Sequence, residues 1–374
     1  MSRLDFKTQI AADLLTWYRE HKRDLPWRQT DDPYRILLSE FMLQQTQVDT
    51  VIPYYHRFLD RFPTVFDLAN ASQDDVLKAW EGLGYYARAR NLHKAAHSIA
   101  MDFGGTVPDT YDELKSLPGF GPYTTAAVLS IAYDRDHAVL DGNVIRVVTR
   151  LFDIGDDVTQ TRVKNRLWDL AQALLPKGEA GTYNQAVMEL GAMVCTAKNP
   201  ACDQCPVQKY CAAYRVGNPQ RLPVKGKKKP RPHYTLCAGI VWHNDKVLIT
   251  QRPQNGLLGG LWEFPAGTQQ DGESLQDTCR RGIRETAGID VKINDRYRTV
   301  KHAFTHFSIT LHTFLCCYVK GKARPLTCDN LAWVVGADFN AYAFSRTSRK
   351  LIEYIQQDVQ PDLFAFEHNL REVP

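Results

Sequence analysis

The stretch LPGFGPYTTAAV, residues Leu117–Val128, places two glycines around one phenylalanine just before a helical pattern of small residues. Gly119 and Gly121 allow positive φ and close approach of another backbone. Proline suits the first turn of a helix, so a helix is expected to begin at Pro122 or Tyr123. The bare N–H groups of such a helix start can bind an anion, and a DNA phosphate would fit. A plain helix–turn–helix connection is the alternative.

The composition is that of an ordinary globular protein. The chain has 374 residues, which predicts two domains, with 44% hydrophobic and 24% charged residues. No run of apolar residues is long enough to span a membrane, and MSRLDFKTQIAADLL does not read as a signal peptide. We therefore expect a cytoplasmic protein in a reducing interior, associated with the nucleoid in a bacterium. The net charge of +4 permits an acidic polymer as partner without requiring one.

The pattern of apolar and polar residues changes once along the chain, from helical spacing to strand-like runs. Residues 1–214 show apolar residues at helical spacing and no strand-like alternation, which predicts an all-α domain. Residues 215–232 carry prolines, glycines and a basic run, as an exposed linker would. Residues 233–374 begin with two apolar runs joined by His-Asn-Asp, which indicates a hairpin, and end in a helical pattern. We expect an α+β fold for this second domain.

Four of the nine cysteines crowd into one loop, residues 195–211. Cys195, Cys202, Cys205 and Cys211 have the spacing C-x6-C-x2-C-x5-C. A reducing compartment argues against disulfides. Four thiolates can hold zinc or a [4Fe–4S] cluster, and structural zinc sites usually show two C-x2-C pairs, whereas this loop has one. The spacing favours the iron–sulfur cluster over zinc.

Two carboxylates are candidates for acid and base chemistry. Glu40, in DDPYRILLSEFMLQQTQV, shares a helix face with aliphatic residues, so desolvation should raise its pKa and let it hold a proton. Asp141, in HAVLDGNVIRVV, precedes a helical pattern and is expected to cap that helix and stay ionised. The alternatives are a solvated surface glutamate at 40 and a hairpin turn at Asp-Gly.

The hairpin and the cysteine loop resemble the DNA glycosylase superfamily that includes endonuclease III. In bifunctional members a lysine that follows the hairpin attacks the sugar, and the matching residue here is Tyr123, whose phenol cannot form a Schiff base. The resemblance therefore implies base excision without strand cleavage. It also implies a [4Fe–4S] cluster on the four cysteines.

The stretches SEFMLQQTQV and LDGNVIRV resemble the MutY type of adenine DNA glycosylase, which removes adenine mispaired with 8-oxoguanine. The resemblance implies that Glu40 protonates adenine and later assists water, and that Asp141 stabilises the sugar cation. The implied partner is duplex DNA with A:8-oxoG or A:G mispairs, bound by a monomer. The implied DNA contacts in this part of the chain are Arg28, Gln45, Tyr85, Gly119, Gly121, Tyr123, Asn143 and Gln185.

The second domain resembles a Nudix fold that has lost hydrolysis. Gly267–Ile289 follows the Nudix spacing, but two of the expected metal-binding glutamates are Gly282 and Thr286. By resemblance, Phe304, Thr305 and His306 form the loop that touches 8-oxoguanine, with threonine where many members carry serine. Two rival functions remain: an endonuclease III-like glycosylase with lyase activity, and an active Nudix hydrolase that docks on DNA.

Overall fold

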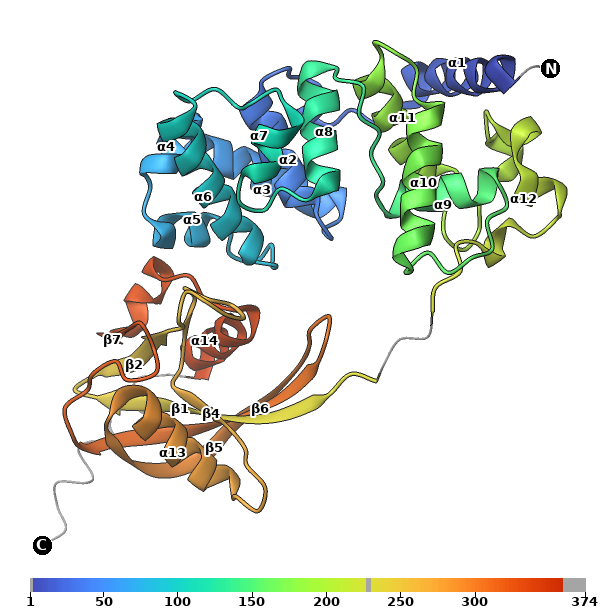
Figure 1. Ribbon diagram of the computed structural model, residues 1–374. Helices are drawn as coiled ribbons and strands as arrows, with labels where there is room; N and C mark the ends of the chain where they lie inside the picture. Colours follow the sequence, from blue (N-terminus) through green and yellow to red (C-terminus); the bar gives the residue numbers. More distant parts are fainter. Residues whose placement is uncertain (1–2, 227–229, 359–374) are drawn as a thin grey trace, which may run out of the picture. The chain divides into compact units, whose positions relative to one another are not determined.

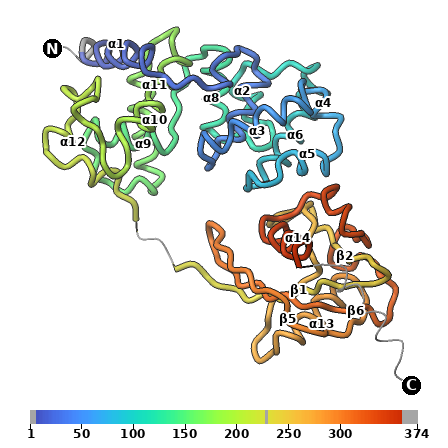
Figure 2. Tube along the Cα trace, turned by 180° about the vertical axis from the view of Figure 1, so that it is seen from behind, coloured from blue at the N-terminus to red at the C-terminus, as the bar shows by residue number. Residues whose placement is uncertain are grey.

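The computed structural model describes residues 3–226 and 230–358 and divides into two compact units (Figures 1 and 2). The first unit comprises Met1–Asn70 and Asn91–Lys228, and the second comprises Ala71–Arg90 and Lys229–Pro374. Lys227–Lys229 of the predicted linker lie outside the described residues.

The first unit is helical, as predicted, and residues 3–226 contain no strand. None of the described helices is long and apolar enough to cross a membrane. The α-helices in residues 3–226 are α1 (Arg3–His21), α2 (Pro33–Leu43), α3 (Val48–Arg61), α4 (Val65–Asn70), α5 (Gln73–Ala79), α6 (Ala87–Asp102), α7 (Tyr111–Ser116), α8 (Pro122–Tyr133), α9 (Gly142–Leu151), α10 (Thr161–Leu174), α11 (Ala180–Met193) and α12 (Ala212–Arg215). Of these, α5 belongs to the second unit and α6 spans both units. Short 3-10 turns lie at η1 (Pro26–Arg28), η2 (Cys202–Gln204), η3 (Gln208–Tyr210) and η4 (Pro219–Arg221).

Local signals define the helix starts that matter for the site. Asp32 caps α2 by accepting a hydrogen bond from the backbone N–H of Tyr34 at 2.9 Å, and Pro33 is the first helical residue. Asp141 caps α9, so the alternative of a hairpin turn at Asp-Gly is wrong. Helix α8 begins at Pro122, as predicted.

The two glycines of the α7–α8 connection play different parts. Gly119 has φ of 84°, and a Cβ there would lie 2.7 Å from Cβ of Asn91 and 2.9 Å from Cε1 of Phe41. Gly121 is the N-cap of α8 with φ of −82°, and a Cβ there would meet nothing within 4 Å. The expected use of positive φ is therefore correct for Gly119 and wrong for Gly121, because only the first glycine reverses the chain against α2.

The second unit is built on a seven-stranded sheet in the described residues. The strand order is β3-β2-β1-β6-β5, with β4 also paired to β1 and β7 to β2; β1 and β6 run parallel, and all other pairs are antiparallel. The strands are β1 (His233–His243), β2 (Lys246–Gln251), β3 (Trp262–Glu263), β4 (Ala266–Thr268), β5 (Asp290–Ala303), β6 (Ser308–Lys320) and β7 (Asn330–Val334). The remaining helical elements are α13 (Leu275–Ala287), the 3-10 turn η5 (Gly336–Ala341) and α14 (Arg346–Asp358).

Helices cover both faces of this sheet. Alternate residues of β1 point to opposite sides: Cys237 packs with Ile283 of α13, and Ile240 packs with Leu351 of α14. Because both faces are covered, the middle of β1 is buried on each side. The result is a three-layer α+β unit, in agreement with the predicted fold class (Figure 1).

The segment Ala71–Arg90 belongs to the second unit through long-range polar contacts. Glu81 accepts a hydrogen bond from Nη2 of Arg349 at 2.6 Å. Asp74 accepts one from Nε2 of Gln251 at 2.8 Å. A helical segment that precedes most of the first unit's sequence therefore packs against strand β2 and helix α14.

We predict that Gly119→Ala destabilises the fold and that Gly121→Ala does so much less. The first substitution forces an L-residue into left-handed backbone and against Phe41, which should cost at least about 1–2 kcal/mol. The second loses on the order of 0.5 kcal/mol, because alanine is a poorer N-cap than glycine. Chemical denaturation of both variants measures the difference, and equal losses would contradict it.

Candidate active site

One cavity in the first unit gathers six of the predicted site residues. Its empty volume is about 1410 Å³, counted with the solvent at its mouth, and residues of α2, α3, α8 and α11 line it. The six are Arg28, Glu40, Tyr123, Asp141, Asn143 and Gln185. Residues from five separate stretches of the sequence therefore face the same space.

Glu40 lies on the buried side of α2 and is only 4% exposed. Its neighbours Ile36 and Leu37 are fully buried, as the helical spacing predicted. The Tyr123 hydroxyl donates a hydrogen bond to Oε2 of Glu40 at 3.0 Å. Burial raises the pKa of Glu40 to about 7 and the charge of Asp141 adds to this, whereas the Tyr123 hydrogen bond opposes it. A large fraction of Glu40 is therefore protonated near neutral pH.

Asp141 is held at the start of α9. Its Oδ1 accepts a hydrogen bond from the backbone N–H of Val144 at 2.7 Å, and its Oδ2 accepts one from the Asn143 side chain at 3.0 Å. Burial raises the pKa of Asp141, and these hydrogen bonds oppose the increase. The helix dipole favours the same charged form. The cavity thus offers a carboxyl group prone to protonation and a second carboxyl whose hydrogen bonds favour its charged form against the effect of burial.

Asn143 is tied into a chain of hydrogen bonds inside the protein. Its Nδ2 donates to Asp141, and its Oδ1 accepts from Nη2 of Arg146 at 2.7 Å. Nε of Arg146 in turn donates to the carbonyl oxygen of Cys195 at 2.7 Å. A continuous polar path therefore joins Asp141 to the first cysteine of the 195–211 loop. A DNA contact by Asn143 stays a prediction.

An ion cluster around Glu189 lines another part of the cavity, and the sequence analysis did not predict it. Glu189, which is 1% exposed, accepts hydrogen bonds from both Arg23 and Arg28. Gln185, one turn earlier on α11, accepts a hydrogen bond from the Tyr18 hydroxyl at 3.4 Å. The i, i+4 relation of Gln185 and Glu189 is the one sequence signal that places Glu189 on the cavity side of α11.

The remaining predicted contacts of the first unit lie outside the cavity lining. Gln45 is exposed in the turn after α2 with φ of 59°, an uncommon conformation for a residue other than glycine. Gly119 and Gly121 lie in the α7–α8 connection. The structure therefore does not bring these three residues to Glu40, and their contacts with DNA stay predictions.

The predicted contacts of the second unit meet at the tip of the β5–β6 hairpin. Phe304 is half-buried, whereas Thr305 and His306 are exposed. The Tyr85 hydroxyl lies 3.3 Å from Oγ1 of Thr305, and the Tyr85 side chain is 46% exposed with φ of 49°. Arg88 donates a hydrogen bond to the carbonyl oxygen of Gly84 at 3.0 Å, which braces the turn that carries Tyr85.

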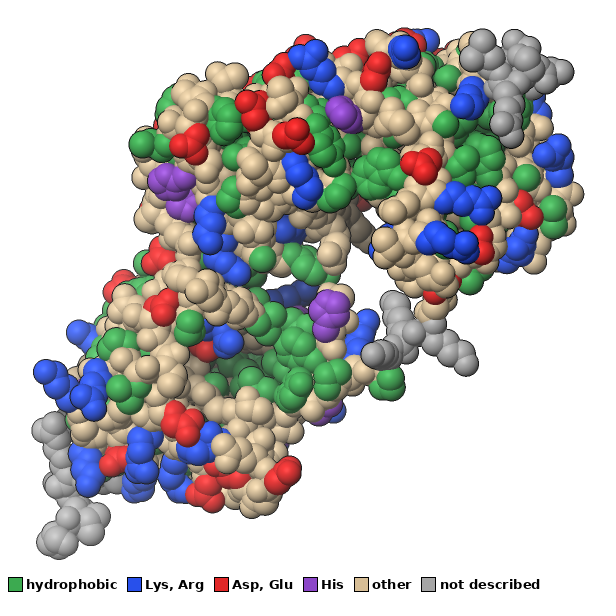
Figure 3. Space-filling view, viewed as in Figure 1, with side chains coloured by type: hydrophobic (Ala, Val, Ile, Leu, Met, Phe, Trp, Pro, Cys, Tyr) green, Lys and Arg blue, Asp and Glu red, His purple; other side chains and the backbone are tan. Residues whose placement is uncertain are grey.

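An apolar cleft runs beside this hairpin tip. Figure 3 shows hydrophobic side chains gathered around a hollow in the strand-containing unit. The cleft has an empty volume of about 970 Å³, and Phe304, Phe307 and Leu257 are among its lining residues. The rings of Phe304 and Phe307 stack with centroids 4.6 Å apart. This aromatic pair gives the hairpin tip a rigid base.

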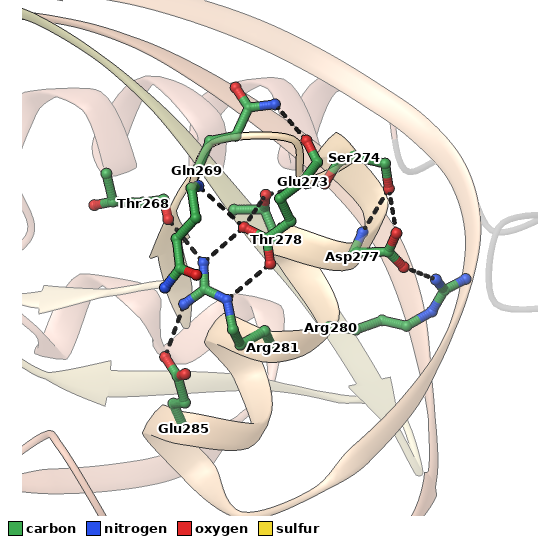
Figure 4. Close-up of polar contacts among 10 residues, drawn as sticks. Thr268, Gln269, Glu273, Ser274, Asp277, Thr278, Arg280, Arg281 and Glu285 are labelled. Atoms are coloured by element: carbon green, nitrogen blue, oxygen red, sulfur yellow. Dashed lines mark hydrogen bonds and ion pairs between the residues drawn. The ribbon is translucent and has the colours of Figure 1, made fainter.

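The Nudix-like helix α13 presents an arginine network instead of a metal site (Figure 4). Arg281 donates to both carboxylate oxygens of Glu273 at 2.8 Å and to Glu285 at 3.0 Å. Positions 282 and 286 carry glycine and threonine, which supply no carboxylate. Because Glu273 and Glu285 are both paired with a guanidinium, the described residues of this helix do not fit a divalent cation.

The four cysteines of the 195–211 loop fit an iron–sulfur cluster by donor chemistry. All four are free and half-buried, and Nη1 of the buried Arg150 donates to Sγ of Cys195 at 3.2 Å. Burial raises the pKa of Cys202, Cys205 and Cys211, and repulsion among the thiolates adds to it, so a bound cation would be needed to hold them all as thiolates. The described side chains include no group of three or more metal-ligating residues already arranged as a metal site.

Comparison with known proteins covers both units. The HhH-GPD superfamily of base excision DNA repair proteins matches residues 38–173, the iron–sulfur binding domain of endonuclease III matches residues 195–211, and a NUDIX domain matches residues 237–354. The adenine DNA glycosylase of Rattus norvegicus is 34% identical over 94% of this chain and 78% of that protein. The adenine DNA glycosylase of Homo sapiens is 35% identical over 95% and 75%.

One solved structure supports the fold of the helical unit. A thermostable thymine-DNA glycosylase is 30% identical, with a TM-score of 0.53, over 58% of this chain and 100% of that chain.

The matched iron–sulfur domain, together with the donor set of the loop, identifies the cofactor of residues 195–211 as a [4Fe–4S] cluster.

We predict that Glu40→Gln changes the pH dependence of stability. A folded-state pKa of about 7, raised from 4.5, means that the folded protein binds the Glu40 proton more tightly than the unfolded chain. Wild-type stability therefore falls as pH rises between these values, by about 3 kcal/mol for this group. Glutamine resembles the protonated acid, so the variant escapes this loss.

The measurement is the free energy of unfolding of both proteins from about pH 5 to about pH 8. The variant should gain stability over wild type as pH rises. Glu20→Gln, an exposed position on α1, controls for the substitution itself. A difference between wild type and Glu40→Gln that does not change with pH would show that Glu40 titrates normally.

Proposed function

The chain belongs to the adenine DNA glycosylases, base excision repair enzymes that act on duplex DNA, and we propose that it removes adenine paired with 8-oxoguanine or, less efficiently, with guanine. The observation that supports this most is that Glu40 and Asp141 line one cavity in different environments. Glu40 is desolvated with a pKa of about 7, and Asp141 is a hydrogen-bonded helix cap. Cleavage of an N-glycosidic bond needs one acid and one anion in this arrangement.

The proposed reaction begins with adenine rotated out of the duplex into the cavity. Glu40 donates its proton to a ring nitrogen of adenine, and the bond between that base and C1′ of the sugar breaks. The base leaves with the bonding electron pair, so positive charge develops on the sugar. The Asp141 carboxylate stabilises this charge by its proximity.

Water completes the hydrolysis. Glu40, now ionised, takes a proton from water as the water oxygen bonds to C1′, which regenerates the acid. Tyr123 occupies the position of the lyase amine, and its hydroxyl donates to Glu40. Because a phenol cannot form a Schiff base, the proposed product is an abasic site in an uncut strand.

The DNA contacts assigned by resemblance support recognition of a mispair. In this proposal Gly119 and Gly121 let a DNA backbone approach the start of α8, Gln45 fills the gap left by adenine, and Tyr85 inserts beside the partner base. Arg28 and Gln185 line the cavity that would receive adenine.

Recognition of the oxidised base is assigned to the second unit. Phe304, Thr305 and His306 are at a hairpin tip, and the exposed Thr305 hydroxyl can hydrogen-bond to 8-oxoguanine. The four cysteines would hold the [4Fe–4S] cluster, which braces its loop.

We predict that base release depends on the residue opposite adenine. Duplexes that differ only at that residue should give fastest excision opposite 8-oxoguanine, slower excision opposite guanine, and background release opposite thymine. Glu40→Gln should lower the single-turnover rate by at least about 10³-fold while duplex binding persists, because the variant cannot donate a proton. Equal excision from every duplex, or an active Glu40→Gln variant, would reject the proposal.

Two further measurements separate the rival functions. Borohydride trapping of a covalent protein–DNA adduct would support an endonuclease III-like lyase, which the phenol at Tyr123 argues against. Release of pyrophosphate from 8-oxo-dGTP would support a Nudix hydrolase. Neither product is expected, because Tyr123 offers no amine for the adduct and Arg281 pairs with Glu273 and Glu285 in the Nudix-like motif.

We predict that Tyr123→Phe moves the alkaline limb of the pH–rate profile upward. Excision should decline above about pH 7 in wild type as Glu40 loses its proton. The Tyr123 hydrogen bond favours the charged form of Glu40, so its removal raises the pKa of Glu40 further. Single-turnover rates across the pH range test this, and a limb that moves downward would contradict the assigned direction.

A further inference from the structure

The charged cluster at Glu189 is centred on a buried carboxylate that lines the cavity. Oε1 of Glu189 accepts from the backbone N–H of Arg23 at 2.9 Å, from its Nε at 2.9 Å, and from Nη1 of Arg28 at 3.1 Å. Oε2 accepts from Nη2 of Arg23 at 2.7 Å and from Nη2 of Arg28 at 2.9 Å. One carboxylate thus accepts five hydrogen bonds, four of them from the two guanidinium groups and one from a backbone N–H.

The surroundings leave Arg28 little freedom to turn. Nη1 of Arg28 also donates to the carbonyl oxygen of Arg23 at 3.0 Å, and its guanidinium lies 5.5 Å from the centroid of the Tyr18 ring. The Glu189 side chain is 1% exposed, and the two arginines hold its pKa at about 2. Glu189 is therefore charged at every pH at which the protein works, and the cluster carries one net positive charge.

Arg23, Arg28 and Glu189 all line the cavity that contains Glu40. Resting on the proposed function, we propose that Glu189 is a positioning residue for base recognition. It holds Arg23 and Arg28 as a rigid pair of hydrogen-bond donors that face the acceptor nitrogens of a flipped adenine. It also offsets one of their two positive charges at the wall of the cavity that Glu40 lines.

Both parts follow from elementary chemistry. A guanidinium presents its donors in a planar fork, so fixing the plane before the base arrives reduces the ordering cost of binding. Two arginines without a carboxylate would place two positive charges at the wall of a desolvated cavity. Such charge favours the ionised form of a nearby carboxyl group and would draw the proton from Glu40.

The groups that set the charge around Glu40 come from several elements. The titratable and charged residues that line the cavity with it are Arg23, Arg28, Asp49, Tyr123, Asp141 and Glu189. Glu189→Gln changes their net charge by +1 and leaves side-chain volume nearly unchanged. Glu189→Asp keeps the charge but withdraws the carboxylate by one methylene. The two variants therefore separate charge from geometry.

The test is single-turnover adenine excision from an A:8-oxoG duplex by the full cluster-loaded chain, from about pH 5 to about pH 9. Glu189→Gln should lower the plateau rate at least tenfold and move the alkaline limb to lower pH. Glu189→Asp should keep the alkaline limb at the wild-type pH, because the charge is kept, but its plateau rate should be lower than that of wild type. Glu179→Gln, which breaks the exposed ion pair with Arg19, is the matched charge control and should follow wild type.

Binding to a duplex with an uncleavable adenine analogue, the visible absorption of the cluster and the thermal transition report separately on the fold. If Glu189→Gln does not fold, Glu189→Asp decides the matter. A folded Glu189 variant with the wild-type plateau rate and the wild-type alkaline limb would overturn the inference. An alkaline limb that moves equally in Glu189→Gln and Glu189→Asp would also overturn it. A wild-type chain that releases no adenine would instead reject the proposed function.

Discussion

The hydrogen bond between Tyr123 and the buried Glu40 joins the two features on which this structure depends. Glu40 is desolvated because α2 turns its aliphatic face inward, and Tyr123 arrives because α8 starts directly after the glycine hairpin. The same hairpin packs on α2 at Phe41, the residue after Glu40, because Gly119 and Phe120 both lie against the Phe41 ring. The loop proposed to grip DNA and the proposed acid are thus parts of one packed assembly, so backbone approach and base position can be set together.

The second unit shows how a fold can keep its architecture while its chemistry changes. The three-layer sheet and the helix of the Nudix motif are present, and Arg281 still binds Glu273. With glycine and threonine at positions 282 and 286, no carboxylate cluster remains on that helix in the described residues. What the unit offers instead is the hairpin tip, where Thr305 contacts Tyr85 above a stacked aromatic pair. In the proposed function this unit contributes the surface of that hairpin tip.

Local patterns predicted the parts that short-range physics controls. Asp32 and Asp141 each precede a helical pattern of apolar residues, and a carboxylate at that position accepts a hydrogen bond from a free backbone N–H of the first turn. The desolvation of Glu40 followed from helical spacing alone. The cluster of Glu189 with Arg23 and Arg28 did not, because Glu189 is more than 160 residues from either arginine and no local rule pairs them. Nor did local rules reveal that Ala71–Arg90 packs against β2 and α14, or that Gly121 keeps a negative φ.

The protonation state of Glu40 is the central claim, and infrared difference spectroscopy measures it directly. The carbonyl stretch of a protonated carboxyl group can be followed in wild type minus Glu40→Gln, with Glu side chains labelled by carbon-13, as pH is raised. The account predicts that this band titrates with an inflection near pH 7, set by burial and opposed by Tyr123. An inflection near 4.5, the ordinary value for a glutamate, would show that water reaches the carboxyl group and would contradict it.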